Sequence, residues 1–134
     1  MNPIESRVYR LTRADVVRYA GASGDFNPIH WSDRQARDLG LPGVIGHGLL
    51  TMGLALRAVT DWAGDPAAIR SYRARFARPV VVPDNDDGVE IKVAGKVVAE
   101  GQSSVTVRLD VVVGGGPVLS RVTVEVARPA PPAP

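Results

Sequence analysis

The sequence predicts an α+β domain in which an antiparallel sheet of about five strands wraps around a long central helix. The first observation is the uncharged stretch 48–56, whose apolar residues would occupy every side of a helix and therefore need cover on most faces. This stretch is too short to span a membrane, which takes about 20 apolar residues. The second observation is a series of alternating apolar and polar segments after Ala67, a pattern typical of half-buried strands.

Four strands are predicted in the second half of the chain, at residues 69–77, 89–98, 105–113 and 118–127. A fifth is placed at residues 4–10. Glycine and proline mark the breaks between the strands, most clearly at Gly101 and at residues 114–117. Because these two breaks are short, consecutive strands are expected to pair antiparallel.

Two short helices are expected before the central one. The first, residues 14–20, has Thr12 as its cap, and the second, Asp33–Asp38, follows a capping-box pattern of Ser32 and Gln35. Residues 21–30, between the two helices, are too rich in small and turn-forming residues to be regular.

Composition and length are those of one globular domain. A chain of 134 residues suffices for a single core, so residues 1–127 are expected to fold as one unit. Residues 128–134 are proline-rich and are expected to form a tail without fixed structure. The net charge of +2 comes from basic residues interspersed with acidic ones, which argues against a nucleic-acid partner.

Cysteine is absent, which removes disulfides, thiol nucleophiles and cysteine metal sites from consideration. Residues 1–11 are charged at Glu5, Arg7 and Arg10 and lack the apolar core of a signal peptide. A cytoplasmic location without membrane attachment is therefore expected.

The two histidines, His30 and His47, each lie in a cluster of small or turn-forming residues. Asp25 precedes His30 across an Asn27-Pro28 break, where the proline ring fixes its own φ and biases Asn27 away from helix. A bent loop can turn the carboxylate and the imidazole toward one point. Because a histidine with a reference pKa of about 6.5 can take and give a proton near neutral pH, Asp25 and His30 are a candidate acid–base pair.

The second cluster places His47 and Gly48 at the amino end of the central helix. Backbone amides there lack intrahelical partners, and the helix dipole adds partial positive charge. The N–H of Gly48 is thus a candidate donor to a developing oxyanion, and one such donor can contribute about 10²- to 10³-fold in rate. His47 and Asn27 are further candidate substrate contacts, although for His47 holding the loop against the helix is favoured over direct proton transfer.

Structural roles stay open for the same residues. Asp25 can tie its own loop, His30 can be a buried hydrogen-bonded side chain, and Asn27 can simply shape the turn. A metal site is disfavoured, because two histidines and one acid lack a zinc-type spacing, and no cofactor is expected. A serine hydrolase is disfavoured because no G-x-S-x-G motif occurs.

Residues 19–30, YAGASGDFNPIH, resemble the hydratase-2 motif of the MaoC-like dehydratases, and residues 46–53, GHGLLTMG, resemble that family's second block. The resemblance extends over residues 11–127. It implies a hotdog fold, in which an antiparallel sheet wraps a long central helix. It also implies a hotdog dimer, either a homodimer or a heterodimer with a related subunit.

Carried over by position, the family's catalytic pair falls on Asp25 and His30, and its carbonyl donor falls on the N–H of Gly48. The resemblance implies reversible syn addition of water to a trans-2-enoyl thioester of CoA or acyl carrier protein, giving the (3R)-3-hydroxyacyl form. Some family members have a serine where this chain has Leu56, so a second polar contact in the site is not expected.

Two other functions are weighed against this one. A hotdog thioesterase usually carries an acidic residue on the central helix to activate water, and residues 49–60 contain none. A non-catalytic hotdog partner of an active subunit has no need of an acid–base pair, so the retention of both Asp25 and His30 argues against it.

Overall fold

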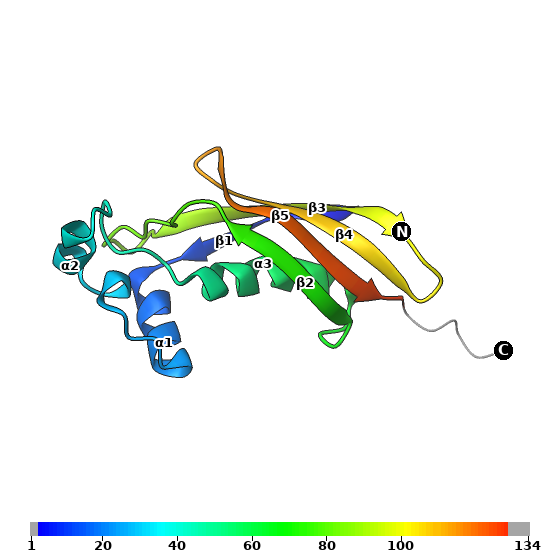
Figure 1. Cartoon of the computed structure of the whole chain (residues 1–134), viewed down its shortest axis with the longest axis horizontal. Helices are drawn as coiled ribbons and strands as arrows, with labels where there is room; N and C mark the ends of the chain where they lie inside the picture. Colours follow the sequence, from blue (N-terminus) through cyan, green and yellow to red (C-terminus); the bar gives the residue numbers. More distant parts are fainter. Residues whose placement is uncertain (1–2, 129–134) are drawn as a thin grey trace.

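A computed structural model describes residues 3–128 of the chain. Along the sequence the elements are β1 (Ile4–Leu11), α1 (Arg13–Ser23), the 3₁₀ helix η1 (Pro28–His30), α2 (Asp33–Asp38), α3 (Gly48–Ala63), β2 (Ile69–Phe76), β3 (Val89–Glu100), β4 (Ser104–Val113) and β5 (Gly116–Ala127). The five strands form one antiparallel sheet in the order β1-β3-β4-β5-β2, which leaves β1 and β2 at its edges. Figure 1 shows this sheet passing over α3, with α1 and α2 gathered near the amino end of that helix.

The core lies between the inner face of the sheet and one side of α3. Alternate residues of β4 are buried, namely Val105, Val107, Leu109 and Val111, because successive side chains of a strand point to opposite faces. They belong to one apolar cluster with the buried side of α3, which consists of Met52, Ala55, Ala58 and Val59. Aliphatic burial therefore holds the sheet and the helix together, and the predicted α+β hotdog architecture is confirmed.

The central helix differs from its prediction in length and cover. It extends to Ala63 and not only to residue 56, and it ends at Gly64, whose φ of 70° favours glycine. Cover on most faces was expected, but the side chain of Leu49 is 63% exposed and Gly53 is also exposed. The reason is geometric, since a five-stranded sheet curls around only one side of the helix in a single subunit.

The helix caps follow the sequence closely. Thr12 caps α1 in a capping box with Asp15, and α1 runs past residue 20 to Ser23, where Gly24 takes a φ of 77°. Ser32 caps α2 by accepting a hydrogen bond from the amide of Gln35. Strand ends lie within one residue of the predicted ones, except at the end of β3 and the start of β5, where each strand is two residues longer than predicted.

Residues 129–134, which make up most of the expected tail, lie outside the described residues. Arg128, the first residue of that tail, donates its amide to the carbonyl of Ser103 and pairs with Glu100 at 3.3 Å. Among the helices of residues 3–128, none has the length and apolar character needed to cross a membrane.

Candidate active site

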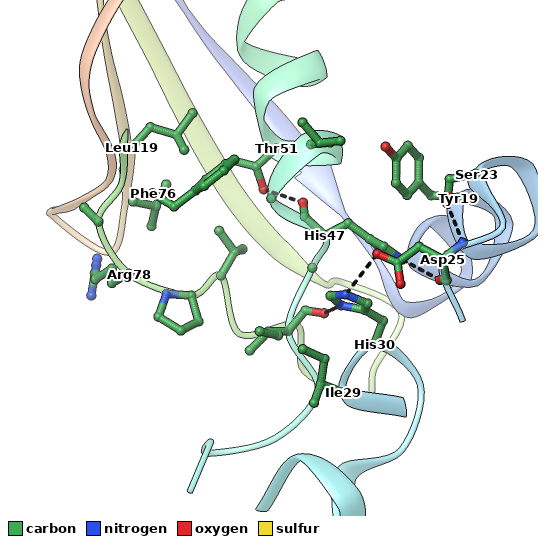
Figure 2. Close-up of a pocket in the computed structure, with 18 residues that line it drawn as sticks. Tyr19, Ser23, Asp25, Ile29, His30, His47, Thr51, Phe76, Arg78 and Leu119 are labelled. Atoms are coloured by element: carbon green, nitrogen blue, oxygen red, sulfur yellow. Dashed lines mark hydrogen bonds and ion pairs between the residues drawn. The ribbon is translucent and has the colours of Figure 1, made fainter. Parts of the chain in front are cut away.

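A cavity of about 620 Å³ opens at the amino end of α3. Its walls come from the end of α1 and the loop after it, η1, the first turn of α3 with the residues just before it, the end of β2 with the segment after it, and β5. Figure 2 shows Asp25, His30 and His47 at one end of this cavity, and Phe76, Leu119 and Arg78 toward the other. The two sequence clusters that carry the histidines thus meet in space.

The loop between α1 and η1 is shaped by its own side chains. The amide of Asp25 donates to Ser23 Oγ at 3.1 Å, and Asp25 Oδ1 accepts from the amide of Asn27 at 3.2 Å. Asn27 Oδ1 then accepts from the amide of Ile29 at 3.3 Å and so caps η1, in which Pro28 is the first residue. These short-range bonds turn the chain so that Asp25 and His30 face each other.

Asp25 and His30 are close enough to act on one substrate. Asp25 Oδ2 lies 3.8 Å from His30 Nε2, and the exposed fractions of the two side chains are 51% and 8%. The distance is long for a direct hydrogen bond but suits two groups that share a water or hydroxyl between them. Both residues line the cavity, and their role as an acid–base pair stays a prediction.

The tautomer of the neutral His30 ring is set by a backbone group. His30 Nδ1 lies 2.7 Å from the carbonyl oxygen of Ile45, and a carbonyl can only accept. The proton therefore sits on Nδ1, and Nε2 presents a lone pair on the side of Asp25. The chain is held in this position because the amide of Ile45 donates to the carbonyl of Ile29 at 3.0 Å.

His47 is packed behind the pair. It is 2% exposed, its ring stacks on that of His30 at 3.7 Å between centroids, and Tyr19 contacts it edge-on at 4.7 Å. Its Nε2 lies 3.1 Å from the carbonyl oxygen of Asp25, so Nε2 carries the proton. Its Nδ1 is buried and has no hydrogen-bond partner within residues 3–128. His47 thus links the first turn of α3 to the Asp25 loop.

The first turn of α3 supplies the other half of the site. His47 is the N-cap residue, but within the described chain its side chain makes no cap hydrogen bond. The backbone N–H groups of the first turn therefore remain available to donate to a ligand. Phe76 lies so close to Gly48 that a Cβ there would be 2.8 Å from Phe76 Cε1. Glycine therefore leaves room for both the aromatic ring and an approaching acceptor at this helix end.

Asn27 lies apart from the cavity that holds the pair. Its side chain caps η1, and it lines a separate, shallower hollow formed with α2. Its geometry favours the shape-setting role over a substrate contact.

The side chains of Asp25, His30 and His47 each offer a ligand atom, and these atoms lie within 4.8 Å of one another. The ring geometry opposes a shared metal ion. Imidazole lone pairs lie in the ring plane, and the two rings are stacked with an interplanar angle of 21°, so their lone pairs do not converge. In addition, Nδ1 of His30 and Nε2 of His47 face carbonyl oxygens. The donor set fits proton transfer better than metal binding.

Three contributors were not found from the sequence. Ile45 acts through its backbone carbonyl, which leaves no signature in residue type. Phe76 ends β2 and Arg78 follows it by two residues, and the position of this part of the chain beside α3 depends on how the sheet curls.

Asp33 braces the segment that carries Ile45. Asp33 Oδ1 accepts from the amide of Val44 at 2.9 Å and from Arg13 Nη2 at 2.8 Å. The hydrogen bond from Val44, followed by that from Arg13, lowers the pKa of the Asp33 carboxyl below its ordinary value. An ionised Asp33 thus ties α1 and α2 to the chain just before α3.

Comparison with known proteins gives a consistent picture. The model of the MaoC-like domain family matches residues 1–114. The chain is 40% identical over 99 residues to 3-hydroxyacyl-thioester dehydratase X of Mycobacterium tuberculosis, a match that covers 74% of this chain and 31% of that protein. The chain therefore spans less than a third of the length of this curated relative.

Solved structures agree. A MaoC-like dehydratase superposes with a TM-score of 0.89 at 35% identity, covering 96% of this chain and 40% of the other. A chain of the ChsH1-ChsH2 complex from Mycobacterium tuberculosis superposes with a TM-score of 0.83 at 25% identity, covering 96% of both chains.

Proposed function

The chain belongs to the MaoC-like domain family, and on that premise we propose that it is an (R)-specific enoyl-thioester hydratase that also catalyses the reverse dehydration. The substrate is a trans-2-enoyl thioester of CoA or acyl carrier protein, and the product is the (3R)-3-hydroxyacyl thioester. The relative from Mycobacterium tuberculosis, which is named as a 3-hydroxyacyl-thioester dehydratase, supports this reaction class.

One observation carries the proposal. His30 Nε2 and Asp25 Oδ2 lie 3.8 Å apart in a cavity whose wall includes the amino end of α3. Addition of water to an enoyl thioester requires a base, a second group that holds the water, and an electropositive site for the thioester oxygen, here the helix end.

In the dehydration direction, the lone pair of His30 Nε2 takes the proton from C2 of the substrate. The resulting negative charge spreads to the thioester oxygen, which faces the amide of Gly48 at the helix end. His30 then returns the same proton to the C3 hydroxyl, which leaves as water, and Asp25 positions that hydroxyl by accepting its hydrogen bond. Because proton and hydroxyl depart on the side of one base, the elimination is syn, and hydration repeats the steps in reverse.

Thioester hydrolysis is a weaker explanation of the site. The first acidic residue after Gly48 is Asp61, in the last turn of α3, where it pairs with Arg7 at 3.4 Å. Its carboxylate is therefore at the far end of the helix from the pair and is engaged elsewhere.

The test is a hydration assay of the purified chain with crotonyl-CoA and with crotonyl carrier protein as substrates. The reaction is monitored by the loss of enoyl-thioester absorbance, and the product is identified by chiral analysis. Asp25→Asn and His30→Gln are each expected to lower kcat about 10²-fold or more. Asp38→Asn, an exposed carboxylate of α2 outside the cavity, is the matched control. Full turnover in both cavity variants would refute the mechanism, and release of free thiol in step with the absorbance change would identify a thioesterase.

We propose in addition that a second hotdog subunit covers the open side of α3 and the free edge of β2. Large apolar side chains are exposed there, with Leu49 at 63%, Phe76 at 61% and Tyr72 at 49%. An unpaired edge strand beside such a surface is normally covered. The ChsH1-ChsH2 complex, whose chain has the same fold, supports a related subunit as the partner. Sedimentation velocity should give twice the chain mass of 14.2 kDa if the partner is a second copy, or a mass that rises only when the related subunit is added. A fully active monomer would contradict both assemblies.

A further inference from the structure

Arg78 lies at the end of the cavity opposite Asp25 and His30 (Figure 2). Its guanidinium is held by the turn between β4 and β5: Nε donates to the carbonyl of Pro117 at 3.2 Å, and Nη2 donates to the carbonyls of Gly116 at 2.9 Å and of Val113. A Cβ on Gly116 would lie 2.7 Å from Nη2, so glycine is needed for this close approach. The guanidinium is thus fixed in place before any ligand arrives.

The positive charge of Arg78 is not compensated by a carboxylate. All three of its acceptors are neutral carbonyl oxygens, and within residues 3–128 no acidic side chain lies at ion-pairing distance from it. Nη1 has no acceptor among the described residues. Arg78 therefore presents the N–H groups of Nη1 in a fixed orientation together with a full positive charge. Such a guanidinium is well suited to bind phosphate oxygens.

The reaction fixes which end of the substrate points toward Arg78. The thioester carbonyl is bound at the amide of Gly48, and C2 and C3 extend toward His30 and Asp25. The sulfur lies on the other side of the carbonyl carbon, so it faces the end of the cavity formed by Phe76, Leu119 and Arg78. The pantetheine arm that follows the sulfur must leave the cavity past this end.

CoA and acyl carrier protein deliver acyl groups on the same arm, 4′-phosphopantetheine, which ends in a phosphate ester. We propose that Arg78 binds this phosphate at the mouth of the cavity, an inference that rests on the proposed function. The contact is made alike in substrate and transition state, so its loss should raise KM and leave kcat nearly unchanged.

The test compares two substrates that differ only in the phosphate, crotonyl-4′-phosphopantetheine and crotonyl-pantetheine. Arg78→Gln is expected to raise KM about 10-fold for the first and less than about twofold for the second. Arg78→Lys, which keeps the charge but not the carbonyl contacts that hold the guanidinium in place, should fall between wild type and Arg78→Gln. Arg108→Gln is the matched control, because it removes an exposed arginine of β4 that does not line this cavity.

An equal loss with both substrates would overturn the proposal, because it would mean that Arg78 only clamps the β4–β5 turn. So would an unchanged KM for crotonyl-4′-phosphopantetheine. Crotonyl-CoA and crotonyl carrier protein, assayed alongside, identify the carrier that supplies the phosphate, since the natural one combines the higher wild-type kcat/KM with the larger loss in Arg78→Gln.

The hydratase proposal and the Arg78 proposal can fail separately. Hydration of crotonyl-pantetheine by the wild type tests the first without any phosphate. Calorimetric binding of 4′-phosphopantetheine to wild type and to Arg78→Gln tests the second without turnover, and equal affinities would reject it.

Discussion

The sheet and the connection between α1 and α3 are held together by different kinds of contact. In β4 and β5 the buried side chains are mostly valine and leucine, and their packing depends on volume and not on direction. In residues 24–47 the decisive contacts are single hydrogen bonds to named atoms, such as His30 to the carbonyl of Ile45 and His47 to the carbonyl of Asp25. Substitutions in the sheet should therefore cost stability, whereas substitutions at these histidine hydrogen bonds and at Gly48 should cost activity.

Among the variants that keep Asp25 and His30, the largest effect is expected at Gly48, where the connection meets α3. In Gly48→Ala the new methyl group would lie 2.8 Å from Phe76 Cε1, so the ring must shift into the space where the thioester oxygen approaches. We expect kcat/KM to fall about 10²-fold. The melting temperature should change little, because alanine is the better helix former.

Val107→Ala is the counterpart of this variant within the sheet. Val107 is fully buried, so its truncation should lower the free energy of unfolding by about 1.5 to 3 kcal/mol. If the proposed function holds, the folded protein should keep kcat/KM within about twofold, since the site is built from other elements. Thermal denaturation and the hydration assay are run on both variants. The contrast between site and sheet would be refuted if Gly48→Ala lost stability and Val107→Ala lost turnover.

A smaller effect is expected at His47, which touches both members of the pair without contacting the reacting carbons in the proposed mechanism. His47→Phe keeps a ring to stack on His30 but removes the N–H that holds the Asp25 carbonyl. We expect kcat to fall about 10-fold, because a loop shift of about 1 Å misplaces the carboxylate. His47→Gln, which retains an N–H donor, should recover part of the loss.

A double-mutant cycle separates this positioning role from a general structural one. If His47 acts through Asp25, His47→Phe should cause less than a twofold further loss in an Asp25→Asn background. Losses that multiply in the two backgrounds would show that His47 acts independently of Asp25.

The sequence was sufficient for the sheet and for the loop that bends at Pro28. Strand alternation has a period of two and appears directly in segments such as Val105–Val111, whose buried residues match the pattern. The pairing of Asp25 with His30 was foreseeable because a helix was excluded and a turn could bring the two together. In both cases the information is local.

The contacts between distant segments could not be foreseen. The stacking of His30 on His47 depends on where α3 begins in space, and the carbonyl of Ile45 has no side-chain signature. The exposure of Leu49 follows from how far a five-stranded sheet curls, a quantity that hydrophobicity alone does not give. Arg78 belongs to the same class, because its three carbonyl partners lie at least 35 residues away in the sequence.

The smallest effect is expected at Asp33, where the connection is tied to α1. Since the folded-state pKa of Asp33 is lowered, its contribution to stability is present above the unfolded value and is lost as pH falls through the folded value. Asp33→Asn should lower the free energy of unfolding by about 1 to 2 kcal/mol near neutral pH. The difference in unfolding free energy between the variant and wild type should narrow below about pH 4. Urea denaturation at several pH values measures this difference.

Asp38→Asn, which loses an exposed pair with Arg34 at 3.6 Å, is the control and should change stability by less than about 0.5 kcal/mol. An Asp33→Asn gap that stayed constant into the acid range would mean that the Val44 amide and Arg13 do not hold an ionised carboxylate, and that the connection is braced by packing as the sheet is.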